Sequence, residues 1–372
     1  MMDIRKATTY RPTVAVRGMM LLAAIGIMLT VVSCSADEEA EKSNSQPTTL
    51  EVAAFTRDYN ISELPETRAL PAGFSVYEPA EATDIDIFLC QTDMVNSHDV
   101  VSNASGDWRS HIIIDAGKQY YIYGYMPKNA ATSAEVTVLD GNFANGAVLN
   151  LYGLSTVSQS DVGVIVGVKQ GDSERKDITI VDDLRLGLFS FIGQKSSDGN
   201  FVYLLLDHLY SAIGLQMRIN ANYNTLRQIR LKSMQLLTNA ASTMTAQVAL
   251  RANATGSNPV ESITWQPAAG ESTSTIYTNA EGLALTTTYQ DISTAMFASA
   301  MNGRLTLRCV YDVYDTAGNL IRADQQSDNL LPTLPSAAPG EKTVIRLTVN
   351  PTYLYMLSDP DLNNPTVSFE VM

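Results

Sequence analysis

The stretch IGLQMRI at residues 213–219 alternates apolar and polar side chains, and LTLRCVYDV at residues 305–313 does the same over nine positions. Successive side chains of a β-strand point to opposite faces of a sheet, so this alternation is typical of a strand with one buried face. The second run leads into the turn sequence DTAGN at residues 315–319 and then into LIR at residues 320–322, which predicts a hairpin.

Similar short runs fill most of the chain. They lie at residues 85–89, 120–125, 136–138, 163–168, 178–180, 345–349 and 367–371. Many short strands at regular spacing are typical of β-sandwiches. We therefore predict an all-β fold of two tandem β-sandwich domains of the transthyretin-like, Greek-key type. Only residues 201–210 and 293–301 also fit a helix, and neither has good capping residues.

The polar cluster QKSSDGN at residues 194–200 is the best candidate for a domain boundary. A chain of 372 residues fits two domains of ordinary length. We place an N-terminal domain at residues 69–198 and a C-terminal domain at residues 199–372.

The first 33 residues have the pattern of an export signal. Four basic residues precede an apolar run at residues 18–32, which is short for a membrane-spanning helix of about 20 residues. The sequence VVSC at residues 31–34 resembles a bacterial lipobox, so we predict a lipoprotein signal peptide at residues 1–33 and lipid attachment at Cys34. The alternative is a membrane anchor or an ordinary signal with a chance cysteine. A polar, aperiodic tether begins at Cys34.

The charge of the chain excludes some partners. Its net charge is −14, and removal of residues 1–33 leaves 21 basic and 38 acidic residues. Such a surface repels nucleic acid and anionic lipid head groups, so we expect no nucleic-acid partner. The remaining cysteines, Cys90 and Cys309, each lie in an apolar-alternating run and are predicted to be small buried side chains rather than a disulfide pair.

No sequence motif predicts catalysis. The chain has three histidines and none of the common hydrolase, metalloprotease, phosphate-loop or dinucleotide signatures. We expect His208, in the apolar segment LDHL, to be a hydrogen-bonded core residue. The acidic sequence at residues 359–370 partly matches a calcium-binding loop, but Asn364 replaces the glycine of the sharp turn, so a plain turn is preferred. We predict no catalytic residue, no metal and no cofactor, and hence no enzyme.

The tyrosine-rich run YYIYGY at residues 120–125 allows a second reading. With Trp108 it would form an aromatic platform for sugars. Aromatic residues that alternate in a strand more often fill the core from one face of a sheet.

Several segments together resemble the Bacteroidetes fimbrillins, a family of Mfa-like fimbrial subunits and fimbrium-associated lipoproteins. The resemblance rests on the lipobox, on the acidic DEE at residues 37–39 and on the TRA tripeptide at residues 67–69. Three longer segments add to it: YYIYGYMP at residues 120–127, LDHLYSAI at residues 206–213 and VNPTYLYMLSDP at residues 349–360. The resemblance covers nearly the whole chain after the signal, and its motifs are structural rather than catalytic.

The resemblance implies a mechanism of assembly. A lipid-tethered precursor at the outer membrane is cut by an Arg-specific protease, the first strand leaves, and an extended segment of another subunit fills the groove by strand addition. Here Arg68 matches the cut arginine, with Arg57 as a rival, and residues 50–55 match the removable strand within residues 34–68.

The C-terminal strand would supply Val367, Phe369 and Val371 to the neighbouring subunit, unless it closes its own domain. The resemblance thus implies a stalk, tip or anchor subunit of a cell-surface fimbrium, anchored by lipid before processing, which binds other subunits and a host protein or glycan. The alternative function is a glycan-binding lipoprotein of the outer-membrane surface.

Overall fold

The structure is a computed structural model in which residues 48–57, 59, 74–76, 84–101, 108–171, 186–253, 258–298, 305–331, 338–351 and 360–371 are described. All of these residues belong to one compact unit, residues 45–372. The predicted lipid attachment point Cys34 and the predicted cleavage site Arg68 lie outside the described residues.

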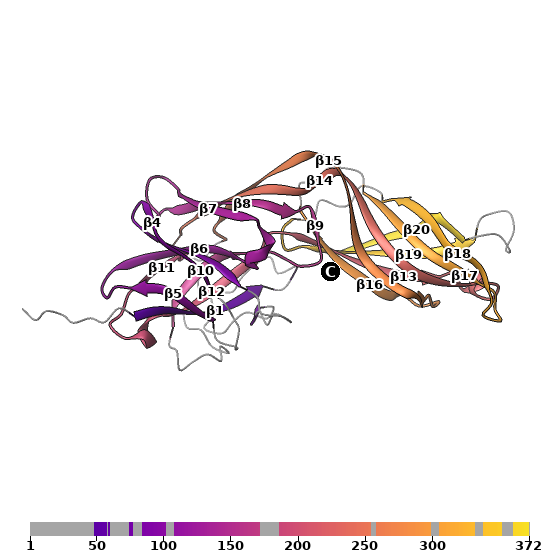
Figure 1. Cartoon of the computed structure of the whole chain (residues 1–372), viewed down its shortest axis with the longest axis horizontal. Helices are drawn as coiled ribbons and strands as arrows, with labels where there is room; N and C mark the ends of the chain where they lie inside the picture. The colour runs from indigo at the N-terminus through magenta and orange to yellow at the C-terminus, as the bar shows by residue number, and fades with distance from the viewer. Residues whose placement is uncertain are drawn as a thin grey trace, which may run out of the picture. The chain divides into compact units, whose positions relative to one another are not determined.

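Three sheets contain nearly all of the described chain (Figure 1). The nine-stranded sheet has the order β2-β1-β12-β10-β6-β3-β4, with β5 paired to β1 and β11 paired to β6. Its strands are β1 (Thr48–Arg57), β2 (Phe74–Val76), β3 (Ile85–Gln91), β4 (Met94–Val101), β5 (Trp108–Ile114), β6 (Gln119–Met126), β10 (Gly163–Gln170), β11 (Ser190–Ile192) and β12 (Phe201–His208). The all-β prediction is confirmed.

The six-stranded sheet has the order β18-β17-β14-β8-β7, with β15 paired to β14. Its strands are β7 (Ser133–Val138), β8 (Gly146–Ser155), β14 (Gln228–Arg251), β15 (Val260–Ala284), β17 (Thr306–Tyr314) and β18 (Leu320–Leu330). The five-stranded sheet has the order β20-β19-β13-β16-β9. Its strands are β9 (Val157–Ser158), β13 (Ser211–Ile219), β16 (Gln290–Phe297), β19 (Lys342–Pro351) and β20 (Pro360–Val371).

The described helical elements are short: two 3-10 helices, η1 (Lys128–Ala130) and η2 (Ser197–Asn200), and one α-helical turn, α1 (Ala221–Asn224). Among the described residues, no helix is both long and apolar enough to cross a membrane.

One face of the nine-stranded sheet encloses its own hydrophobic cluster, here called the inner cluster. All its members come from strands of this sheet: Leu50, Val52, Ala54, Ile85, Ile87, Leu89, Val101, Ile112, Ile114, Tyr120, Ile122, Met126, Ile165, Val168, Phe191, Val202, Leu204 and Leu206. The strands β4 and β5 also meet, and the backbone N–H of His111 donates to the carboxylate of Asp99 at 2.6 Å. A single sheet that surrounds its own apolar side chains must curl, and this contact joins two of its outer strands.

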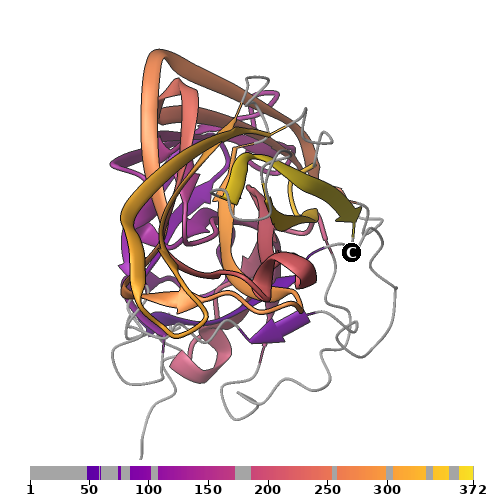
Figure 2. The same cartoon turned by 90° about the vertical axis from the view of Figure 1, so that its right-hand side faces the viewer.

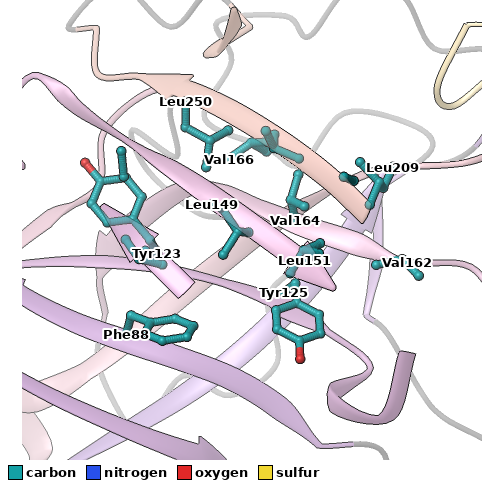
Figure 3. Packing of buried hydrophobic residues seen from close by; sticks show 14 of the residues in the cluster. Phe88, Tyr123, Tyr125, Leu149, Leu151, Val162, Val164, Val166, Leu209 and Leu250 are labelled. Carbon is teal, nitrogen blue, oxygen red and sulfur yellow. The ribbon is translucent and has the colours of Figure 1, made fainter. Parts of the chain in front are cut away.

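The other face of the nine-stranded sheet packs on β8 and β14, and we call the buried residues between them the shared cluster. Figure 3 shows Phe88, Tyr123, Tyr125 and Val164 of the nine-stranded sheet in one cluster with Leu149 and Leu151 of β8 and Leu250 of β14. This sheet-on-sheet arrangement is a β-sandwich.

A third cluster, the C-terminal cluster, lies between the five-stranded sheet and the strands β14 and β17. It contains Ile213, Leu215, Met217 and Ile219 of β13, which are the apolar positions of the alternating run at residues 213–219. Leu307, Cys309, Tyr311 and Val313 of β17 face them across the sandwich. Both runs that predicted half-buried strands therefore form them.

The long strands β14 and β15 belong to both sandwiches. Residues 228–237 of β14 pair with β17, whereas residues 243–251 of the same strand pair with β8. Figure 1 shows β14 and β15 side by side along this course. The predicted division at residues 198–199 stays a prediction, and β11 and β12, on either side of it, belong to one sheet.

The two segments that also fitted a helix are strands. Residues 201–208 form β12 and residues 290–297 form β16. In β12, Val202, Leu204 and Leu206 join the inner cluster, while Phe201, Tyr203 and Leu205 join the shared cluster. A strand buried on both faces has a continuous apolar sequence without alternation, which is why periodicity did not identify it.

Candidate functional site

The strand β1, which contains the predicted removable residues 50–55, has partners along both edges. On one side it runs parallel to β12, from Glu51 opposite Phe201 to Thr56 opposite Leu206. On the other side it pairs antiparallel, first with β5 and then with β2. Removal of β1 would therefore leave two rows of backbone groups without partners.

Apolar side chains of β1 are buried on both of its faces, although Thr49 is exposed and Glu51 and Ala53 are half-buried. Leu50, Val52 and Ala54 point into the inner cluster and are at most 2 % exposed. Phe55 points to the opposite face, is fully buried in the shared cluster, and makes an edge-on contact with Tyr203 at 6.2 Å between ring centroids. Removal of this one strand would open two hydrophobic clusters at once.

Polar side chains fix the beginning of β1. The carboxamide of Asn200, which is fully buried, donates to the hydroxyl of Thr48 and to the carbonyl of Gln194 at 3.2 Å, and accepts from the Gln194 N–H at 2.8 Å. The hydroxyl of Ser110 on β5 donates to the Leu50 carbonyl at 2.8 Å. These bonds set the register of β1 against both neighbours.

An aromatic contact follows the end of β1. The ring of Tyr59 stacks on the imidazole of His208 at 4.0 Å between centroids. His208 Nδ1 contacts the carboxylate of Asp161, and only 8 % of the His208 side chain is exposed. The prediction of a hydrogen-bonded core histidine is confirmed. Sequence reasoning missed Tyr59 and Asn200, because neither stands in a recognisable motif.

The two candidate cleavage arginines differ in what the structure describes. Arg57 ends β1 and its backbone pairs with Phe74 of β2. Arg68 lies outside the described residues, as does Cys34. The choice of cleavage site and the lipid attachment stay predictions.

The predicted donor residues lie in β20, which forms the end strand of the five-stranded sheet. It pairs antiparallel with β19, with Val367 opposite Leu347, Phe369 opposite Ile345 and Val371 opposite Thr343. Figure 2 shows β20 in yellow, ending beside the mark of the C-terminus. In this structure the strand pairs within its own chain, and its role as a donor stays a prediction.

The tyrosine-rich run is part of the core. Tyr120, Tyr123 and Tyr125 are fully buried, and the hydroxyl of Tyr123 donates to the Phe143 carbonyl at 2.6 Å. Burial raises the pKa of the phenol groups of Tyr123, Tyr125 and Tyr210. These side chains hold the sandwich together and do not form an exposed sugar platform.

Both described cysteines are free and buried, as predicted. Burial raises the pKa of the Cys90 thiol to about 12 and that of the Cys309 thiol to about 12. Since the thiolate is the reactive form, neither is a candidate nucleophile. In the part of the chain that the structure describes, no three His, Cys, Asp or Glu side chains are grouped so that they could hold a metal ion.

No family model and no curated protein sequence matches the chain. Among solved structures, a Bacteroides fragilis protein provisionally named a cell adhesion protein is similar, with a TM-score of 0.45 and 9 % identity over 87 % of this chain and 97 % of that chain. A fimbrial protein from Bacteroides vulgatus gives a TM-score of 0.37 and 13 % identity over 88 % and 99 %.

The fimbrial anchor protein Mfa2 from Porphyromonas gingivalis gives a TM-score of 0.31 and 10 % identity over 86 % of this chain and 97 % of that chain. Fimbrial proteins of Bacteroidetes, the class that the sequence resembles, are thus among the structures similar to this chain.

Proposed function

We propose that this chain is a non-enzymatic structural or adhesive subunit of a cell-surface fimbrium, assembled when β1 is replaced by an extended strand of another subunit. The observation that carries the proposal is the position of β1. It is a single strand, close to the N-terminus, with partners on both edges and apolar side chains buried on both faces. A groove of this kind suits strand addition, because main-chain bonds provide affinity and alternate side chains fill pockets.

The chemistry of the remaining steps follows from the sequence resemblance to fimbrillins. Residues 1–33 direct export, and Cys34 carries the lipid that holds the precursor at the outer membrane. More than one acyl chain is needed for stable anchoring. Adhesion, the role named for the Bacteroides fragilis neighbour, belongs to the same proposal, with a host protein or glycan as the ligand of the assembled fimbrium.

We place the maturation cut after Arg68 rather than after Arg57. The backbone of Arg57 is paired with β2, and proteases cut segments that are free to enter their active sites. Cleavage at Arg57 would first require the end of β1 to separate from β2. Pro65 and Pro71 flank Arg68 in the sequence and disfavour regular secondary structure around it.

The donor in this proposal is β20 of another copy or of another subunit. Its residues Val367, Phe369 and Val371 share one face by alternation, so the strand can present three apolar side chains to a groove. Burial of each Val or Phe contributes roughly 1.5–3 kcal/mol, before the cost of ordering the strand is subtracted.

The test compares Arg68→Ala with the matched control Arg57→Ala in the native host. Surface filaments are purified, run on a gel without boiling, and probed for this chain. We expect an SDS-resistant ladder from the wild type and from Arg57→Ala, and only uncut, folded precursor from Arg68→Ala. A ladder from Arg68→Ala but not from Arg57→Ala would move the cleavage site to Arg57. No ladder from the wild type would refute the role as a polymerising subunit.

A further inference from the structure

The residue Tyr59 connects the removable strand to two other strands. The parallel pairing of β1 and β12 ends with Thr56 opposite Leu206, and Tyr59 and His208 both follow this last pair in the sequence. Tyr59 and His208 meet there, with ring centroids 4.0 Å apart and ring planes inclined by 17°. The Tyr59 hydroxyl also donates to the sulfur of Met296 on β16 at 3.0 Å. Tyr59 is thus attached to β12 and β16 beyond the last backbone pair of β1.

The imidazole of His208 is held ready for this contact. Its Nδ1 contacts Asp161 Oδ2, and Oδ1 of the same carboxylate accepts from the Val162 N–H at 2.8 Å. The backbone N–H of His208 in turn donates to Asp207 Oδ1 at 2.8 Å. With 8 % of the His208 side chain exposed, the ring has little freedom to turn. Because the imidazole is already fixed, less conformational entropy is lost when the Tyr59 ring stacks on it.

We infer that Tyr59 is a latch that keeps β1 in its groove, and that it sets how readily the strand leaves once the chain is cut. The inference deepens the proposed function and rests on it for its biological meaning. The latch consists of the Tyr59 ring, its stacking surface on His208, the Asp161 carboxylate that orients His208, and the Met296 sulfur.

Tyr59 lies between Arg57 and Arg68 in the sequence, so the site of the cut decides which fragment carries the latch. A cut after Arg68 leaves Tyr59 on the same fragment as β1, so the fragment stays attached by the strand and by the ring. A cut after Arg57 leaves Tyr59 on the body of the protein, and only β1 holds the fragment. In the first case a cut subunit keeps its apolar groove covered until another strand displaces the fragment, which protects it from non-specific association.

The test measures opening of β1 in the purified, uncut protein by hydrogen exchange followed by mass spectrometry. Peptides that cover residues 48–57 are compared with peptides from β13 and β19. Loss of an aromatic pair of this kind should change the equilibrium constant for opening of β1 by about threefold to tenfold. Tyr59→Ala should therefore speed hydrogen exchange in β1 by about that factor and leave exchange in β13 and β19 unchanged.

Two further variants serve as controls. Tyr59→Phe keeps the ring on His208 and loses the hydroxyl that donates to Met296, so its exchange should lie close to that of the wild type. Tyr152→Ala removes a tyrosine that is 37 % exposed on β8, far along the sequence from β1, and should leave exchange in β1 unchanged. Equal exchange in Tyr59→Ala and wild type would overturn the inference. So would faster exchange in every strand alike, or a Tyr59→Phe variant as open as Tyr59→Ala.

A second measurement follows the fragment after cleavage. Protein cut after Arg68 is passed over a size-exclusion column at intervals, and the fraction that still carries residues 34–68 is measured. Tyr59→Ala should shorten retention by the same factor as it speeds exchange, and unchanged retention would overturn the latch. Because the exchange experiment needs no protease and no partner, it can support the latch even if the chain never polymerises, so the two proposals fail separately.

Discussion

The strands β1 and β20 lie near opposite ends of the chain and have opposite positions in their sheets. β1 has partners on both edges, β12 on one side and β5 and β2 on the other. In the described chain β20 has one paired neighbour, β19, and stands at the end of its sheet. β20 also contains Pro365, which suits an edge strand because proline cannot donate a ladder bond, whereas β1 contains no proline.

In the proposed function, this difference separates the strand that is replaced, β1, from the strand that is donated, β20. Loss of β1 interrupts two ladders and exposes Leu50, Val52 and Phe55, each worth roughly 1.5–3 kcal/mol of burial. A folded protein is stable by only about 5–15 kcal/mol in total, so the groove must be filled again. Loss of β20 interrupts one ladder and leaves β19 as the new edge.

The largest effect is expected when the two strands are deleted in turn. Without Thr48–Arg57, the isolated subunit should lose most of the protection of its amides in β6, β10 and β12, because both clusters of the nine-stranded sheet are opened. Without residues 366–372, those strands should keep their protection and the monomer should stay folded. Hydrogen exchange of the two shortened proteins measures both outcomes.

The opposite result for the C-terminal deletion would change the interpretation. If deletion of residues 366–372 unfolds the monomer, β20 is an intrinsic part of the C-terminal sandwich rather than a donor. If the monomer stays folded and still forms normal polymers, the donor lies elsewhere in the chain or in another subunit.

A smaller effect is expected from a single side chain in β1. Phe55→Ala removes a fully buried ring that contacts Tyr203, and should lower the free energy of unfolding by about 3–5 kcal/mol. Thr49→Ala, at an exposed position of the same strand, should change it by no more than about 0.5 kcal/mol. Urea unfolding of both variants gives the values. Equal stability of Phe55→Ala and wild type would mean that this face of β1 does not stabilise the fold.

The sequence predicted strands with one buried face from their alternation, whereas one strand buried on both faces, β12, also fitted a helix. Residues 213–219 and 305–313 alternate because their outer faces meet solvent, and both form strands as predicted. Residues 201–208 have apolar side chains on both faces, so their sequence does not alternate and left a helix open as an alternative. The sequence of β1 also departs from strict alternation, because the adjacent residues Ala54 and Phe55 are both fully buried.

Alternation also says nothing about which strand a given strand will pair with. The shared use of β14 by β8 and β17 depends on contacts between residues far apart in sequence. The latch has the same origin, because Tyr59 and His208 meet only once β1 and β12 are aligned in parallel. The resemblance identified the candidate strand, but it did not predict that Phe55 is buried on the face opposite Leu50, Val52 and Ala54.

The smallest effect concerns the polar pair on the sheet that faces β20. Arg308 on β17 holds Asp328 on β18, a strand that contacts β20, through two hydrogen bonds of 2.7 Å each. These bonds lower the pKa of the Asp328 carboxyl below its usual range. A carboxyl with a lowered pKa in the folded state stabilises the fold above its unfolded pKa, about 4, and this contribution is lost as the pH falls through the folded value.

Because both side chains are partly exposed, the contribution should be below about 1 kcal/mol. The difference in unfolding free energy between wild type and Arg308→Gln should therefore be small at pH 7 and smaller still at pH 2. Urea unfolding at the two pH values measures it, with Phe55→Ala as the contrast, since loss of an apolar ring has no such pH dependence. If the Arg308→Gln difference persists unchanged at pH 2, the pair acts through packing rather than charge. The β20 side of the molecule would then resemble the β1 side in what holds it together.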